Sequence, residues 1–246
     1  MLALAGVGAA LGLCIGSFVG TLVLREPEGW RGILLGRSHC PRCATPLGAR
    51  DLIPLWSWLA ARARCRHCGA SLPVFYPLVE IAAAAIGALA FGVTTAPFAV
   101  PAAVLGWWLL ALALIDLRSW RLPDALTLPL IAVGALAAWF GLTPELGPFA
   151  SLLGAAVGYL ALLAVAWAYR RLRAREGLGL GDAKLLAAAG AWLGPAPLPW
   201  VILLAAPMGL VLALARRAPL RGDSAVPFGP PLALACWLLF LWRASA

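Results

Sequence analysis

The sequence predicts an all-α fold: a polytopic membrane protein with eight transmembrane helices and a small cytoplasmic zinc-knuckle-like loop domain. Apolar residues make up 63% of the 246 residues and charged residues only 12%, whereas soluble domains carry about 25% charged residues. Apolar runs recur along the chain, close to the roughly 20 residues that cross a bilayer as a helix. Finally, the basic residues fall almost entirely in alternate links between these runs.

Eight apolar segments are the expected membrane helices. Most of them approach the length that a bilayer requires, but the sixth is short and follows a glycine-rich stretch at 177–181. The expected segments are approximately 2–24, 74–93, 98–117, 125–142, 149–169, 183–197, 199–215 and 229–243.

The distribution of positive charge predicts which links face the cytoplasm. Every Lys and Arg except Arg243 lies in or beside the first, third, fifth and seventh links, and the other three links contain none. Cytoplasmic loops carry an excess of Lys and Arg, so the odd-numbered links are expected in the cytoplasm and both termini outside. This topology also accounts for the net charge of +9, so we expect a lipid bilayer and no nucleic acid as partner.

The chain is expected to divide into three parts. Residues 1–24 form the first transmembrane helix, residues 25–73 a polar cytoplasmic domain, and residues 74–246 a seven-helix membrane domain. A domain of about 50 residues is too small for a robust core of its own. The polar domain therefore needs an additional cross-link such as a metal ion.

Four cysteines in the polar domain have the spacing of a zinc site. They form two CxxC pairs, namely Cys40 with Cys43 and Cys65 with Cys68. Two such pairs at this separation predict tetrahedral zinc, and four thiolates leave no open position, so the role would be structural. Reduced cysteines without metal, or replacement of one thiolate by His39 or His67, are the alternatives. A disulfide is disfavoured in a reducing compartment.

Two aspartates are the candidate catalytic pair. Asp116 follows an apolar helix, where an ionisable residue usually marks function, and Asp182 ends the Gly179–Asp182 GxGD motif before the sixth helix. The alternatives are that Asp116 extends to water beside Arg118 and that Asp182 is an ordinary N-cap. Asp124, after a proline, is expected to cap the fourth helix. The predicted topology places Asp116 and Asp182 at the same cytoplasmic depth.

Two carboxylates at one depth can act as a catalytic dyad. Like charges a few ångströms apart do not both ionise readily, so one proton is shared. The ionised member can then activate water while the protonated member polarises a peptide carbonyl. Neither histidine lies near a candidate nucleophile in the sequence, and there is no Gly-x-Ser-x-Gly motif.

Short motifs in a fixed order carry a family resemblance. They are Gly16-Ser17-Phe18, DLIPLWSWL at 51–59 between the CxxC pairs, YPLVE at 76–80, IDL at 115–117, LPD at 122–124, LTLP at 126–129, GDAKLL at 181–186, GAWLG at 190–194 and PFGP at 227–230. The whole set resembles the GxGD aspartyl proteases and, more narrowly, the bacterial type IV prepilin leader peptidases, which are also N-methyltransferases.

The resemblance implies an aspartic endopeptidase of the inner membrane with its active site facing the cytoplasm. Asp116 and Asp182 would be catalytic, and Gly179, Gly181, Lys184 and Asp124 would support the motif. The substrates would be prepilins or pseudopilins of type IV pili or type II secretion, cut behind a short basic leader. S-adenosylmethionine would serve N-methylation of the new N-terminus.

Two departures from the family pattern bear on methyl transfer. Gly20 stands in the segment where relatives often carry Asn, and Phe75 stands where they often carry Arg. A peptidase without methyl transfer is therefore one alternative. A transporter with a zinc-bound loop is an alternative of another class, but it would place its carboxylates near the midplane. An inactive assembly scaffold is a third. The sequence leaves the oligomeric state open.

Overall fold

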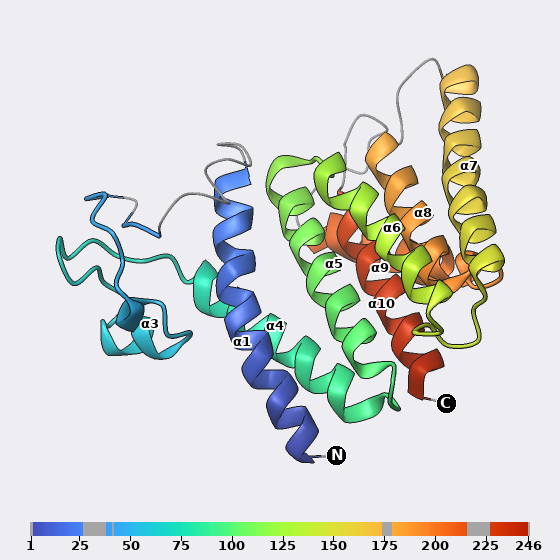
Figure 1. The fold of residues 1–246 in the computed structure, drawn as a ribbon. Coiled ribbons are helices and arrows are strands. Elements are labelled where there is room, and N and C mark those ends of the chain that lie inside the picture. Colours follow the sequence, from blue (N-terminus) through green and yellow to red (C-terminus); the bar gives the residue numbers. More distant parts are fainter. Residues whose placement is uncertain (1, 27–37, 41, 174–178, 216–226, 246) are drawn as a thin grey trace. The chain divides into compact units, whose positions relative to one another are not determined.

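The computed structural model describes residues 2–26, 38–40, 42–173, 179–215 and 227–245. Within these ranges the regular structure is helical, with two isolated β-bridges and no β-strand (Figure 1). The prediction of an all-α fold is therefore confirmed. The chain forms two compact units, Met1–Val93 and Thr94–Ala246.

Helices α1 (Leu2–Arg25) and α4 (Phe75–Val93) pack against each other in the first unit. Glycines at a spacing of four residues allow this close approach. A Cβ atom at Gly8 or Gly12 would lie 2.2 Å from a carbonyl oxygen of α4, and one at Gly16 would lie 2.6 Å from the Cα of Glu80. Small residues at such spacing let helix backbones approach in apolar surroundings. Along the chain, η2 (Ala49–Asp51) and the short α3 (Trp56–Ala60) follow α1 and precede α4.

We predict that Gly12→Leu destabilises the first unit. The added side chain has no space against the backbone of Ala83, and overpacking of this kind costs about 1–3 kcal/mol or more. Thermal unfolding of the purified protein in detergent should show a lower midpoint. Gly6→Leu is the matched control, because a Cβ atom there meets nothing within 4 Å. Equal midpoints for the two variants would contradict this account of the α1–α4 contact.

The second unit contains α5 (Ala99–Ser119), α6 (Asp124–Trp139), α7 (Pro148–Arg173), α8 (Leu180–Leu193), α9 (Leu198–Ala215) and α10 (Gly229–Ser245). Helix α8 contacts α6, α7, α9 and α10, and every residue from 185 to 193 is buried. Its Gly190 lies against Gly154 of α7, where an added Cβ would meet the backbone at 2.0 Å. Because α8 is held on several sides, its first turn has a defined place in this unit.

Each of the eight predicted segments contains a helix, with ends that differ by a few residues. The sixth runs from Leu180 to Leu193 instead of 183–197, because Gly194 adopts a positive φ of 81° and Pro195 follows. Among the described residues, five helices are long and apolar enough to cross a membrane: α1, α4, α5, α7 and α9. Helices α6, α8 and α10 have 16, 14 and 17 residues, so eight crossings are not confirmed.

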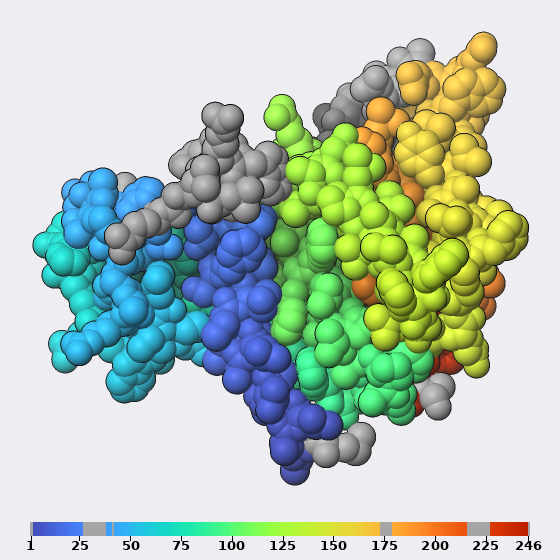
Figure 2. All heavy atoms as spheres, in the orientation of Figure 1, coloured from blue at the N-terminus to red at the C-terminus, as the bar shows by residue number. Residues whose placement is uncertain are grey.

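The outer face of α7 is apolar and exposed. Phe149, Leu160 and Trp167 are 77%, 58% and 59% exposed, and Figure 2 shows this helix, in yellow, uncovered along one side. An apolar surface of this length on an all-helical unit is typical of contact with lipid.

Candidate active site

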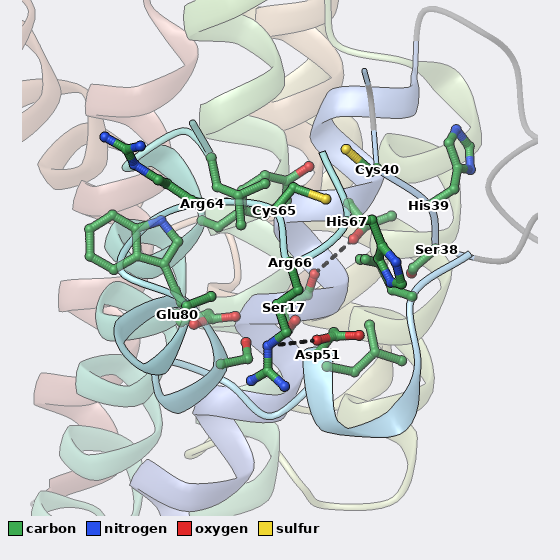
Figure 3. A pocket seen from close by; sticks show the side chains of 18 of the residues that line it. Ser17, Ser38, His39, Cys40, Asp51, Arg64, Cys65, Arg66, His67 and Glu80 are labelled. Atoms are coloured by element: carbon green, nitrogen blue, oxygen red, sulfur yellow. Dashed lines mark hydrogen bonds and ion pairs between the residues drawn. The ribbon is translucent and has the colours of Figure 1, made fainter. Parts of the chain in front are cut away.

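The four cysteines of the first unit form one cluster. Their sulfur atoms all lie within 4.8 Å of one another, and within the described residues this group contains no histidine. The chain reverses tightly in each CxxC segment: the Ala44 N–H donates to the Cys40 carbonyl and the Gly69 N–H to the Cys65 carbonyl. Cys40 and Cys65 are buried, and Figure 3 shows both beside a cavity of this unit. The predicted ligand set is thus brought together.

The electrostatics of the cluster suit metal binding. A hydrogen bond with the Thr45 hydroxyl, at 3.2 Å from Sγ, lowers the pKa of the Cys43 thiol to about 6. A thiol with such a pKa is largely thiolate at neutral pH, and the thiolate is the form that binds metal. Four sulfur ligands favour zinc or a similar soft ion. His39 lies instead 3.4 Å from the Arg25 guanidinium, measured from Nδ1 to Nη2.

Asp116 lies in the last turn of α5 and is buried, with only 6% of its surface exposed. Its Oδ2 accepts a hydrogen bond of 3.0 Å from the backbone N–H of Gly229, the first residue of α10. The N-terminus of a helix offers free N–H groups and a positive dipole end, which favour a carboxylate. The interpretation that Asp116 extends to water is therefore wrong for this structure.

Gly229 is a site residue to which the sequence analysis assigned no role. A Cβ atom there would lie 2.6 Å from Oδ2 of Asp116 and 3.0 Å from its Cγ. Only glycine lets the backbone N–H reach the carboxylate at hydrogen-bonding distance. The available signal was a glycine placed directly before Pro230 and Pro231 at a helix start.

We predict that Gly229→Ala lowers the rate of the reaction that depends on Asp116. The methyl group forces either the carboxylate or the start of α10 to move, and a displacement of about 1 Å at a reacting group can cost roughly 10²-fold. The loss should appear in kcat more than in KM. Gly147→Ala is the matched control, because an added Cβ there meets nothing within 4 Å. An unchanged kcat for Gly229→Ala would refute the positioning role.

Asp182 lies in the first turn of α8, three residues after the N-cap. The N-cap is Gly179, so the alternative that Asp182 itself is the N-cap is wrong. The backbone N–H of Asp182 donates to the Gly179 carbonyl at 3.1 Å, and the Gly179 N–H hydrogen-bonds the Asp182 carboxylate in return. Gly181 permits close approach of this turn to Leu122, whose Cβ would lie 3.0 Å from an added Cβ.

Both candidate catalytic aspartates lie in the second unit, Asp116 in the last turn of α5 and Asp182 in the first turn of α8, although 66 positions separate them in the sequence. Both side chains are withdrawn from bulk water, Asp116 more than Asp182. Each also receives a backbone N–H, from Gly229 and Gly179 respectively. The arrangement has the parts of an acid–base pair of carboxyl groups.

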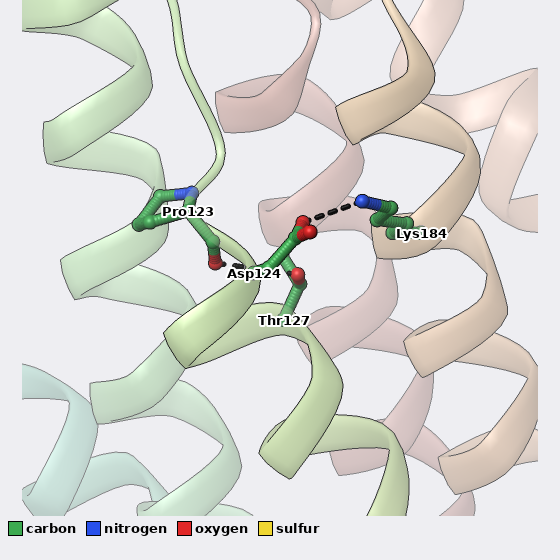
Figure 4. A network of polar contacts seen from close by, with 4 residues as sticks. All are labelled: Pro123, Asp124, Thr127 and Lys184. Atoms are coloured by element: carbon green, nitrogen blue, oxygen red, sulfur yellow. Dashed lines mark hydrogen bonds and ion pairs between the residues drawn. The ribbon is translucent and has the colours of Figure 1, made fainter.

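Asp124 and Lys184 form an ion pair beside this site. The Lys184 Nζ lies 2.5 Å from Oδ1 of Asp124 and joins α8 to α6 (Figure 4). Pro123 is the N-cap of α6, and the Asp124 side chain makes no capping hydrogen bond. The expectation that Asp124 caps this helix is therefore wrong. The Asp124 side chain is 59% exposed, and such a pair contributes only about 0–1 kcal/mol to stability.

Two protein-family models match separate stretches of the chain. The model described as the type IV leader peptidase family matches residues 103–214. The model of the bacterial peptidase A24 N-terminal domain matches residues 10–93.

The chain belongs to the type IV leader peptidase family. The match to the leader peptidase model includes Asp116 and Asp182, and it ends before Gly229. The A24 N-terminal match includes all four clustered cysteines and lies within the first compact unit.

Curated members of the leader peptidase family resemble the chain over most of its length. The protein from Aeromonas hydrophila is 44% identical over 219 residues, which cover 87% of this chain and 74% of that protein. The proteins from Stutzerimonas stutzeri and Pseudomonas aeruginosa are each 38% identical over 259 residues, covering 94% of this chain and 88% of theirs. All three are named prepilin leader peptidase/N-methyltransferase. No solved structure matches the chain significantly.

Proposed function

We propose that this protein is an aspartic endopeptidase that removes the leader of prepilins or pseudopilins and then N-methylates the new N-terminus. The observation that carries the peptidase assignment is that one unit withdraws two carboxyl groups from water, Asp116 in the last turn of α5 and Asp182 in the first turn of α8. It is supported by membership of the leader peptidase family and by the names of relatives up to 44% identical. The family match gives no support to a transporter.

The two carboxyl groups would divide the work of peptide hydrolysis. Like charges at close range do not both ionise readily, so the pair holds one proton. The ionised carboxylate takes a proton from water, and the resulting hydroxide attacks the peptide carbonyl. The protonated carboxyl group polarises that carbonyl by donating to its oxygen. The tetrahedral intermediate then collapses with cleavage of the C–N bond, as the carboxyl group that took the proton from water passes it to the leaving amine nitrogen. The N–H groups of Gly229 and Gly179 hold the two side chains in place.

We propose a multi-pass topology in the inner membrane with the active site facing the cytoplasm and both termini outside. The support is the restriction of basic residues to alternate links. Helices α6, α8 and α10 would complete eight crossings beside the five longer helices. Their 14–17 residues correspond to roughly 21–26 Å at 1.5 Å per residue, so these crossings would be shorter than the bilayer core.

On the basis of the same topology, three consecutive parts of the chain would have different roles. Residues 1–24 would be the first membrane helix, residues 25–73 the cytoplasmic metal-binding domain and residues 74–246 the peptidase domain. Cys40, Cys43, Cys65 and Cys68 would hold one structural zinc ion, because four thiolates complete a tetrahedral site. Lys184 and Asp124 would support the position of α8 from α6.

Methyl transfer requires S-adenosylmethionine, which supplies a sulfonium-bound methyl group to an uncharged amine nitrogen. The departures at Gly20 and Phe75 leave peptidase activity alone as the second candidate function. Both residues lie against Tyr76: an added Cβ at Gly20 would lie 3.4 Å from its ring, and the Phe75 and Tyr76 rings are 6.3 Å apart.

The proposed function is tested by incubating membranes that contain the protein with a prepilin-like substrate. Mass spectrometry of the product should show loss of the leader and, on the new N-terminus, the added mass of one methyl group. A cleaved but unmethylated product supports the peptidase-only candidate. An uncleaved substrate contradicts the proposal and would leave an inactive assembly scaffold.

A further inference from the structure

Segment 52–61 of the first unit is an uncharged stretch within a polar region. It contains no Asp, Glu, Lys or Arg, although Asp51 precedes it and Arg62 follows it. The segment includes α3, and three of its large apolar side chains are at least 46% exposed: Ile53, Trp56 and Leu59. Exposed apolar side chains that gather in one short segment mark a contact with another protein or with a membrane.

The inner side of the segment is fixed to both long helices of this unit. The Leu55 N–H donates a 2.7 Å hydrogen bond to the Glu80 carboxylate of α4, which also accepts one from the Ser17 hydroxyl of α1. Trp58 lines a cavity together with Ser17 and Glu80, and Figure 3 shows the latter two beside each other. Only 6% of Glu80 is exposed. A buried carboxylate needs such donors, so this hydrogen bond fixes the place of the segment.

These contacts place the segment beside α1 and α4 and not beyond their ends. Glu80 comes five residues after the first residue of α4, about 7.5 Å along the helix. Ser17 comes eight residues before the last residue of α1, about 12 Å along it. Leu52 and Pro54 share a hollow with Cys14 of α1, and Figure 1 shows α3 level with the middle of α1. Where α1 and α4 cross a bilayer, the segment therefore lies inside its edge.

Lipid is the partner that this surface fits. Interfacial segments bury an apolar face about 5–10 Å into the boundary between head groups and acyl chains, a range that includes the depth of Glu80. Trp is enriched at this boundary, in agreement with the outward position of Trp56. Arg62 and Arg64, both exposed, follow the segment directly, and basic side chains beside an apolar surface suit anionic head groups.

We propose that segment 52–61 lies in the cytoplasmic leaflet of the membrane as an interfacial anchor, with Ile53, Trp56 and Leu59 in contact with lipid. The inference rests on the proposed membrane topology and adds a lipid contact that the eight crossings do not include. Because the segment joins the two CxxC pairs in the sequence, the anchor also holds the four-cysteine cluster at the membrane surface.

The test measures which collision partner reaches a spin label on the segment, in full-length protein reconstituted into vesicles of phosphatidylethanolamine and phosphatidylglycerol. The label is attached by copper-free coupling to p-azidophenylalanine that replaces Trp56 or Leu59, so that no cysteine is modified. Oxygen is concentrated in the bilayer, whereas a nickel chelate stays in water. Leu89 of α4, 46% exposed, is the matched bilayer reference. Ser71, exposed and paired with Arg64 in a β-bridge, is the aqueous reference.

Labels at Trp56 and Leu59 should show a ratio of oxygen to nickel accessibility several-fold above that at Ser71 and similar to that at Leu89. A ratio as low as that at Ser71 would overturn the anchor and leave α4 as a membrane helix. Low accessibility to both agents would show that protein covers the surface, which would also overturn the anchor. A ratio at Leu89 as low as that at Ser71 would overturn the α4 crossing and, with it, both the topology and the anchor.

Glu80 provides a second measurement on the same labelled protein. Glu80→Ala removes the acceptor of the Leu55 N–H, so the label at Trp56 should become more accessible to the nickel chelate. Glu80→Gln keeps a carbonyl acceptor and should stay near the wild type. Thermal unfolding and zinc content show whether the variants are folded. Unchanged accessibility in folded Glu80→Ala would overturn the role of this hydrogen bond in holding the segment.

Discussion

Asp116→Asn and Asp182→Asn should each lower the rate of leader cleavage by roughly 10²–10⁴-fold, the range that general acid–base catalysis contributes. The amide retains the size of the carboxyl group and can still accept a backbone N–H, so the packing around Gly229 and Gly179 is preserved. What is lost is the ability to exchange a proton with water and substrate. The measurement is the initial rate of cleavage of a prepilin-like substrate in membranes.

Two carboxylates elsewhere in the second unit serve as controls. Glu145 is 92% exposed in its side chain and pairs only loosely with Arg243, at 4.0 Å, so Glu145→Gln should cleave at the wild-type rate. Asp124→Asn should retain much of the activity, because the substitution removes only an exposed ion pair with Lys184. A rate for Asp182→Asn close to that of Glu145→Gln would show that the assignment of the dyad is mistaken.

Cys40→Ser should remove the metal and destabilise the part of the first unit that contains the four cysteines. Cys40 is 2% exposed and its sulfur lies within 4.8 Å of the other three, and a serine hydroxyl is a poor substitute for a thiolate. We expect zinc, measured by atomic absorption, to fall from about one equivalent to none. The thermal midpoint should fall by about 10 °C or more, because the binding energy of a structural metal is folding energy.

The matched control for the metal site is Cys14→Ser. Cys14 is an exposed thiol on α1 outside the cluster. The zinc content and the thermal midpoint of the Cys14→Ser variant should therefore match those of the wild type. A chelator strong enough to strip the wild-type protein should reproduce the lowered midpoint of Cys40→Ser. Full zinc content in the serine variant would show that the four cysteines are not the ligands.

The helices and the aspartate pair could be predicted because their signals are local or topological. Apolar runs locate helices directly, and the alternation of basic links placed the end of one helix and the start of another on one side. That argument predicts that Asp116 and Asp182 act as a pair, and the structure places both in the second unit at helix ends. The four-cysteine cluster could be predicted as well, because the spacing of the metal ligands is visible in the sequence.

Contacts made by backbone atoms across the unit could not be predicted in the same way. The hydrogen bond from Gly229 to Asp116 joins positions 113 residues apart, and no periodicity links them. The role of Asp124 was missed for a related reason: a helix-start aspartate is favoured as a cap, but Lys184 on α8 offers a charged partner. The cavity beside Glu80 depends on packing between α1, α4 and the segment that joins them, which motifs alone do not define.

A double-mutant cycle on Asp116 and Asp182 tests the dyad most directly. If the two carboxyl groups share one proton and act as a unit, their effects are not additive. The Asp116→Asn/Asp182→Asn double variant should then cleave within about twofold of the slower single variant. If the two losses instead multiply, so that the double variant falls far below either single variant, the carboxyl groups act independently and the shared-proton mechanism is wrong.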